Sequence, residues 1–135
     1  MGELRCGSCG ASASGPTAWR CPTCGSPLES ELPPADPATF ADDRSSGVWR
    51  YRGWLPQVDP VALGEPTTAL VEVRAAGKTV LAKLEGALPT GSFKDRGTSV
   101  TVSWLRAHGV RKIVVDSSGN AGASFAAYAA EPGFD

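Results

Sequence analysis

The chain has 135 residues, enough for one modest domain or for a small module joined to part of a larger one. Hydrophobic residues make up 41% and charged residues 20%, which is typical of a folded globular protein and excludes a disordered chain. A net charge of −1 gives no electrostatic reason to expect nucleic acid or an anionic membrane as a partner. No apolar run approaches the roughly 20 residues that cross a bilayer, and the start of the chain lacks an apolar signal region. We therefore expect a cytoplasmic protein.

The first part of the chain, residues 1–29, carries all four cysteines as two Cys-x-x-Cys pairs with eleven residues between them. Each pair is followed by a glycine, which permits the tight turn that lets two thiolates face one metal ion. Four thiolates predict a closed, structural zinc site, and an iron site of the rubredoxin kind is the alternative. Two disulfides or four free thiols are the other interpretations, and the absence of a secretory signal disfavours disulfides. The four expected metal ligands are Cys6, Cys9, Cys21 and Cys24.

The second part, residues 30–68, is rich in proline, aspartate and serine. Proline fixes its own φ angle and favours extended conformations in the preceding residue, so this part predicts an irregular connector. Three aromatic residues indicate that the connector packs on another part of the chain: Trp49, Tyr51 and Trp54.

The third part, residues 69–135, has regular patterns of apolar residues. Strand, loop, helix, strand, loop and helix in succession predict an α/β fold with a parallel sheet, of which these residues form only a portion. In chain order, strands are expected at 69–73, 79–84 and 112–115, and helices at 98–108 and 123–130.

A loop from Pro89 to Gly97 reads Pro-Thr-Gly-Ser-Phe-Lys-Asp-Arg-Gly and contains the lysine of greatest interest, Lys94. The loop lies between a predicted strand and a predicted helix, where catalytic residues collect in α/β folds. A nucleophilic lysine must lose its proton, which burial or a nearby positive charge such as Arg96 favours. We expect Asp95 to pair with Arg96 or to cap the helix, and Phe93 to shield the lysine from water. The alternative is an ordinary surface lysine.

The lysine string resembles the pyridoxal-phosphate (PLP) attachment motif of the threonine synthase family, in the tryptophan synthase β-like (fold type II) superfamily. Residues 64–70 are similar to the family's Gly-x-Thr-Pro-Leu segment, although Pro and Thr are exchanged and two residues are inserted before Leu70. Residues 117–122 are similar to the family's Ser-x-Gly-Asn loop. The resemblance covers nearly the whole chain and is most specific over residues 83–130.

This resemblance implies an incomplete three-layer, parallel-sheet fold type II domain after a small zinc-ribbon-like module. It implies a PLP-dependent lyase, most specifically one that converts O-phospho-L-homoserine and water to L-threonine and phosphate. Lys94 would hold PLP as a Schiff base and then move protons, with Thr90 and Ser92 as supporting groups. Asn120 would hydrogen-bond the phenolic oxygen of the cofactor. The loop at the start of the last helix would bind the substrate carboxylate through Ser117, Ser118, Gly119, Asn120 and Ala121.

The superfamily's glycine-rich phosphate loop, and the polar residue that faces the pyridine nitrogen, come later in the chain. We therefore expect these 135 residues alone to bind PLP poorly and to be inactive. The expected partners are a small amino-acid substrate and either a second copy or a completing C-terminal portion. Three alternatives stay open: another fold type II enzyme such as serine/threonine dehydratase or cysteine synthase, a non-catalytic zinc-binding fragment, and a zinc-ribbon interaction module with a remnant of the enzyme.

Overall fold

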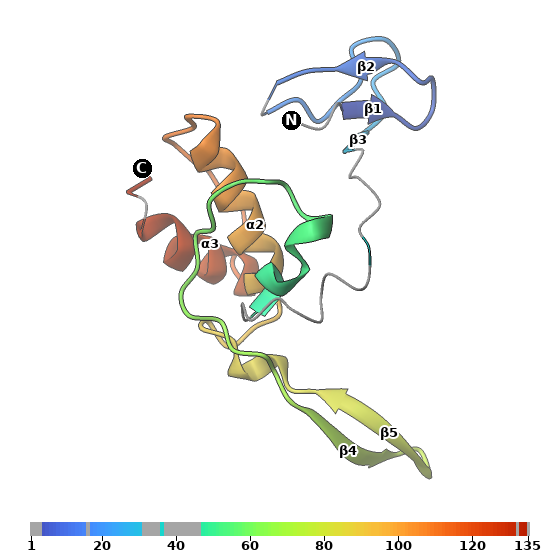
Figure 1. Cartoon of the computed structure of the whole chain (residues 1–135), viewed down its shortest axis with the longest axis vertical. Helices are drawn as coiled ribbons and strands as arrows, with labels where there is room; N and C mark the ends of the chain where they lie inside the picture. Colours follow the sequence, from blue (N-terminus) through green and yellow to red (C-terminus); the bar gives the residue numbers. More distant parts are fainter. Residues whose placement is uncertain (1–3, 16, 31–35, 37–46, 132, 135) are drawn as a thin grey trace.

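The computed structural model of the chain describes residues 4–15, 17–30, 36, 47–131 and 133–134. Two small antiparallel sheets, two α-helices and two 3-10 helices make up its regular structure (Figure 1). In chain order the elements are β1 (Leu4–Cys6), β2 (Ser12–Ala13), β3 (Leu28–Ser30), η1 (Gly47–Trp54), β4 (Leu70–Ala75), β5 (Lys78–Lys83), η2 (Glu85–Ala87), α2 (Lys94–Ala107) and α3 (Asn120–Ala130).

The N-terminal sheet has the strand order β2-β1-β3; Cys6 is the last residue of β1, and the other cysteines lie in the segments between the strands. Arg5 of β1 pairs with Ser12 on one side and with Glu29 on the other, both antiparallel. Strands this short cannot bury an apolar face, so hydrogen bonds alone give this sheet little stability.

A regular hairpin, β4 and β5, projects away from the helices (Figure 1). Its six residue pairs run from Leu70↔Lys83 to Ala75↔Lys78, and the two turn residues, Ala76 and Gly77, have φ angles of 49° and 74°. Two successive residues with positive φ form the turn that matches the twist of a tight hairpin. The two predicted strands are therefore confirmed with bounds shifted by about one residue, and they pair antiparallel.

Both predicted helices form, and both begin earlier than predicted, at Lys94 and at Asn120. α2 and α3 pack together around a small apolar core of Val61, Val102 and Tyr128. The apolar periodicity located the helices without their first turns, because the residues of those turns do not continue the apolar pattern.

The strand predicted at 112–115 is wrong. These residues adopt no regular structure, and Val114 is 86% exposed. A strand forms only beside a neighbouring strand with which it shares backbone hydrogen bonds, and no strand among the described residues lies beside this segment. The parallel sheet expected from the α/β pattern is likewise absent from the part of the chain that the structure describes, where both sheets are antiparallel. Within that same part, no helix has the length and apolar character to cross a membrane.

The connector packs on α2 from residue 47 onward, as its aromatic residues indicated. Trp49 is buried, and its Nε1–H donates a 2.7 Å hydrogen bond to Ser99 Oγ. Ser99 Oγ in turn donates to the Val61 carbonyl at 2.6 Å, and the Val61 N–H donates to Ser103 Oγ at 2.7 Å. Trp49 therefore confirms the packing, whereas Tyr51 and Trp54 remain about 40% exposed. The earlier part of the connector lies largely outside the described residues.

Candidate functional site

Lys94 is the first residue of α2 and is exposed. Gly91 enters the preceding turn with a φ angle of 74°, and Ser92 Oγ accepts a 3.3 Å hydrogen bond from the Lys94 backbone N–H. The Lys94 ammonium lies 4.5 Å from the centre of the Phe93 ring, a cation–π contact. Because Phe93 is itself 58% exposed, the expected shielding of the lysine from water is not seen.

Asp95 is fully buried and connects the lysine loop to α3. Its carboxylate accepts hydrogen bonds from the Thr90 N–H at 2.8 Å, from the Thr90 hydroxyl, and from Ser124 Oγ at 2.7 Å. The expected pairing of Asp95 with Arg96 is wrong, because the Arg96 guanidinium pairs with another carboxylate. The alternative, that Asp95 caps the helix, is wrong too, because Asp95 is the second residue of α2 and its carboxylate accepts from Thr90 and Ser124. The expected supporting role of Thr90 acquires a structural basis, because Thr90 holds the residue next to Lys94.

Arg96 pairs instead with Glu85, a residue that the sequence analysis did not single out. The guanidinium donates from Nε to Glu85 Oε2 at 2.6 Å and from Nη2 to Oε1 at 2.8 Å, a bidentate pair. Thr68 Oγ1 donates to the same carboxylate at 2.8 Å. The hydrogen bonds from Arg96, together with that from Thr68, lower the pKa of Glu85 from 4.5 to about 2. The positive charge of Arg96 is thus compensated by the carboxylate of Glu85.

A signal for Glu85 was present in the sequence: it is the only acidic residue between Lys83 and Lys94. A buried or half-buried arginine requires a carboxylate partner. Searching near Arg96 for a carboxylate other than its immediate neighbour would have found Glu85.

The loop before α3 is organised around Ser117. Its hydroxyl accepts hydrogen bonds from the Gly119 N–H at 3.3 Å and the Gly122 N–H at 3.2 Å. A side chain at Gly122 would come within 2.6 Å of the Ser117 carbonyl oxygen, so the close approach of loop and helix requires glycine there. Asn120 and Ala121 are the first two residues of α3, where backbone N–H groups have no acceptor within the helix.

One face of α3 joins three segments that are far apart in the sequence. Asn120, Ser124 and Tyr128 are spaced four residues apart and so lie on the same side of the helix. Ser124 donates to Asp95 in the lysine loop, and the Tyr128 hydroxyl donates to buried Glu65 at 2.6 Å. Burial, reinforced by this hydrogen bond, raises the pKa of Tyr128. The lysine loop, the segment at 64–70 and the Ser117–Gly122 loop therefore meet at α3.

These residues fit the binding of PLP. Among the described residues the Lys94 ammonium makes no ion pair or hydrogen bond, so its nitrogen is open to an incoming aldehyde. Asn120 has an exposed amide at the start of α3, and the N–H groups beside it suit an anion. Ser118 and Gly119 are exposed next to it in the same loop.

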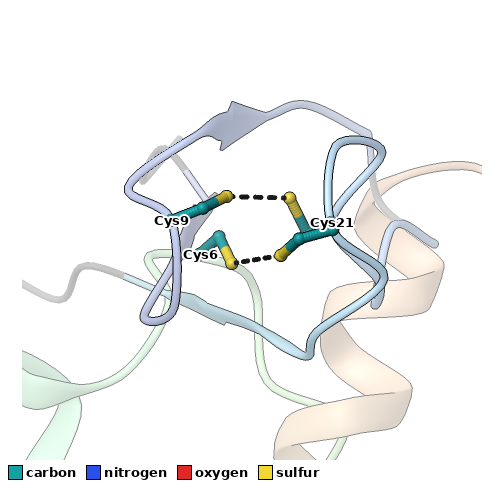
Figure 2. Close-up of side chains that lie close together, drawn as sticks. Cys6, Cys9 and Cys21 are labelled. Atoms are coloured by element: carbon teal, nitrogen blue, oxygen red, sulfur yellow. Dashed lines mark hydrogen bonds between the residues drawn. The ribbon is translucent and has the colours of Figure 1, made fainter.

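The four cysteines form a second candidate site, and Figure 2 shows the labelled side chains of Cys6, Cys9 and Cys21 pointing toward one another. Their sulfur atoms all lie within 4.8 Å of one another, with Cys6 Sγ 3.5 Å from Cys24 Sγ and Cys9 Sγ 3.5 Å from Cys21 Sγ. Cys6 and Cys21 are buried, and Cys9 and Cys24 are exposed. Hydrogen bonds from the Ser26 side chain and backbone lower the pKa of Cys24 to about 6. At Cys9 a backbone hydrogen bond from Ala11 lowers the pKa, but hydrogen bonds with the other three cysteines outweigh it and raise the pKa to about 12.

The two cysteine pairs share one backbone arrangement. The Gly10 N–H donates to the Cys6 carbonyl, and the Gly25 N–H donates to the Cys21 carbonyl, both at 2.9 Å. Both glycines have positive φ angles, 72° and 75°. The tight turns expected after each pair are confirmed, and they place the four sulfur atoms around one point.

Comparison with known proteins identifies a family whose match includes the lysine and Asn120 loops. The family described as "Pyridoxal-phosphate dependent enzyme" matches residues 61–135. Threonine synthase of Mycobacterium tuberculosis is 46% identical over 90 residues, covering 62% of this chain and 25% of that protein. Threonine synthase of Methanocaldococcus jannaschii is 44% identical over 98 residues, covering 67% and 24%, and that of Synechocystis sp. is 36% identical over 121 residues, covering 79% and 31%.

The chain spans about a quarter to a third of the length of these curated relatives. No solved structure matches the chain. The family match covers more than half of the chain and contains every residue from Val61 through the lysine loop, the Ser117 loop and α3. The chain therefore belongs to the pyridoxal-phosphate dependent enzyme family, which has an α/β fold.

Proposed function

We propose that the chain is the lysine-bearing part of a threonine synthase, a lyase that converts O-phospho-L-homoserine and water to L-threonine and phosphate. The observation that carries the proposal is the placement of Lys94 at the start of α2, with its nitrogen in solvent and its loop hydrogen-bonded to α3. The substrate is inferred from the similar proteins, which are threonine synthases.

PLP, when bound, supplies an electron sink for negative charge at the substrate Cα. Lys94 would hold the cofactor as a Schiff base, and its amine, once released, would take the proton from the substrate Cα and return it. Asn120 would hold the cofactor by a hydrogen bond to its phenolic oxygen. The N–H groups of Asn120 and Ala121 orient the substrate α-carboxylate at the N-terminus of α3, with Ser117, Ser118 and Gly119 forming the rest of the loop.

Covalent attachment of PLP at Lys94 tests this proposal. Millimolar PLP should give the chain a weak absorbance band near about 410–430 nm, the range of PLP enzymes. Borohydride should make the attachment permanent, and peptide mapping should place it at Lys94. Lys94→Ala should remove the band, while Lys112→Ala, at an exposed lysine outside the loop, should keep it. Labelling spread evenly over the exposed lysines would contradict the proposal.

A completing portion is the second part of the proposal, because the chain covers only part of each relative's length. We place the protein in the cytoplasm, with a C-terminal portion or a second copy supplying the phosphate-binding loop. The DNA that follows the codon for Asp135 tests this: an in-frame glycine-rich loop is expected. With that portion present, phosphate release from O-phospho-L-homoserine identifies threonine synthase. Formation of a 2-oxo acid from L-serine or L-threonine would instead identify a dehydratase.

A structural zinc site in residues 1–29 is a separate proposal, favoured by the four converging sulfur atoms. Four thiolates leave no coordination position open, so the ion stabilises the fold of a zinc-ribbon-like module and takes no part in the chemistry. In this division, residues 30–68 are the connector and 69–135 carry the enzyme part. Metal analysis of the purified chain should give one zinc per molecule. One iron per molecule, with a coloured chain, would identify the rubredoxin-like alternative. A chain that holds zinc and never labels at Lys94 would be a non-catalytic zinc-binding fragment.

A further inference from the structure

Asp95 and Ser124 are joined by a hydrogen bond that links the two parts of the candidate PLP site. Asp95 directly follows Lys94 in α2, and Ser124 lies one helical turn after Asn120 in α3. Both side chains are completely buried. The contact therefore connects the immediate neighbours of the two residues that the proposed function brings to the cofactor.

We propose that Asp95 and Ser124 are positioning residues, whose hydrogen bond holds residues 90–94 against α3 and thereby sets Lys94 relative to Asn120. This inference rests on the proposed function for its consequence, because the consequence concerns attachment of PLP. Neither side chain would touch the cofactor, since both are buried beneath the exposed Lys94 and Asn120.

The chemistry of Asp95 supports this role. A carboxylate only accepts hydrogen bonds, and Asp95 accepts three: two from Thr90, at the start of the loop, and one from Ser124. The contacts from Thr90 close the loop around the start of α2. The contact from Ser124 is different, because it comes from another helix and does nothing for α2 itself. Ser124 is thus the residue at which positioning can be separated from simple stabilisation of α2.

The chain offers a matched control on α2. Ser103 is also a completely buried helical serine, and its hydroxyl donates to the Ser99 carbonyl at 2.6 Å and accepts from the Val61 N–H at 2.7 Å. None of its contacts reaches the lysine loop. Ser124→Ala and Ser103→Ala therefore both remove a buried hydroxyl, but only the first releases residues 90–94 from α3.

Amide hydrogen exchange measures the hydrogen bond itself. In Ser124→Ala, exchange over residues 90–94 should accelerate about tenfold, the change expected from losing one ordinary hydrogen bond. In Ser103→Ala the same segment should exchange at the wild-type rate. Asp95→Asn, which keeps the side-chain volume, is the second variant and should accelerate the segment at least as much. Equal exchange of residues 90–94 in the two serine variants would overturn the inference.

Attachment of PLP measures the consequence for Lys94. Borohydride labelling at Lys94, relative to exposed Lys112, should fall about tenfold or more in Ser124→Ala, since displacing a reactive group by about 1 Å is costly. Ser103→Ala should label like the wild type. A Ser124→Ala chain that exchanges faster over residues 90–94 but still labels Lys94 over Lys112 as strongly as the wild type would overturn the positioning role. Labelling that is spread evenly over the exposed lysines of the wild-type chain would instead count against the proposed function. The exchange data would still decide whether Asp95 and Ser124 hold the loop.

Discussion

The cysteine module, residues 1–29, and the helical region around α2 and α3 are stabilised by different kinds of interaction. Among the described residues neither has a large apolar core: the module buries the apolar residues Cys6 and Cys21, and the core cluster between the helices consists of Val61, Val102 and Tyr128. The module gathers four sulfur atoms around one point. The helical region instead buries polar side chains that bond one another or the backbone, among them Glu65, Asp95, Ser99, Ser103 and Ser124. The module should therefore depend on one metal ion, and the helical region on many separate hydrogen bonds.

Removing one cysteine should have the largest effect. Cys21→Ser takes one ligand from the proposed zinc site, and structural zinc contributes on the order of 10 kcal/mol to the folding of small modules. We expect loss of bound zinc and loss of exchange protection across β1, β2 and β3, while α2 and α3 keep theirs. Ser12→Ala, at an exposed position on β2, is the control and should keep the metal. Loss of protection in α2 and α3 as well would show that the two regions fold as one unit.

The contrast between the regions also decides what could be predicted from sequence. The turn glycines and the spacing of the cysteines are local signals, so the sequence predicted the convergence of the sulfur atoms correctly. Lys94 and Asn120 were found through motifs that are contiguous in sequence, and both prove to be first residues of helices.

The long-range polar contacts could not be predicted in this way. Ser124 reaches Asp95 across 29 residues, and Tyr128 reaches Glu65 across 63 residues. Buried serines on a helix carry no periodic apolar signal, so sequence patterns treat them as surface positions. The strand predicted at 112–115 failed for a related reason: its apolar run indicated burial, and the neighbours that a parallel strand requires are not among the described residues.

Gly122 tests the close approach of α3 to its own loop. An added Cβ would lie 2.6 Å from the Ser117 carbonyl oxygen, so Gly122→Ala should destabilise the helical region by about 2–3 kcal/mol. Gly97→Ala in α2 is the control, because no atom lies within 4 Å of an added Cβ there. That control should be stabilising by about 0.5–1 kcal/mol, the usual gain for alanine in a helix. Urea denaturation followed by circular dichroism measures both, and equal midpoints would contradict the expectation.

Trp49 tests the attachment of the connector. Trp49→Phe removes the Nε1–H donor, so Ser99 Oγ loses a buried partner, at a cost of about 1–2 kcal/mol. Trp19→Phe, at a side chain that is 64% exposed, should change stability by less than about 0.5 kcal/mol. The same denaturation measurement compares the two. A Trp49→Phe chain as stable as the Trp19→Phe chain would show that the connector contributes little to the helical region.

Glu85 tests the ion pair with Arg96, and pH separates the contribution of its charge from that of packing. Its pKa lies at about 2 in the folded chain, below the ordinary value of 4.5, so the unfolded chain takes up a proton first as the pH falls. The stabilisation is therefore complete above about pH 4.5 and is lost progressively as the pH falls towards 2. Solvent screening limits it to about 1–2 kcal/mol, because roughly a quarter of each side chain is exposed. Glu85→Gln should be less stable than the wild type by that amount at pH 7, and the difference should shrink below pH 4.5. Glu72→Gln, at an exposed residue of β4, should follow the wild-type curve throughout. A Glu85→Gln difference that is independent of pH would mean that Glu85 acts through its packing, and that its charge pairing with Arg96 adds nothing to the stability of the lysine loop.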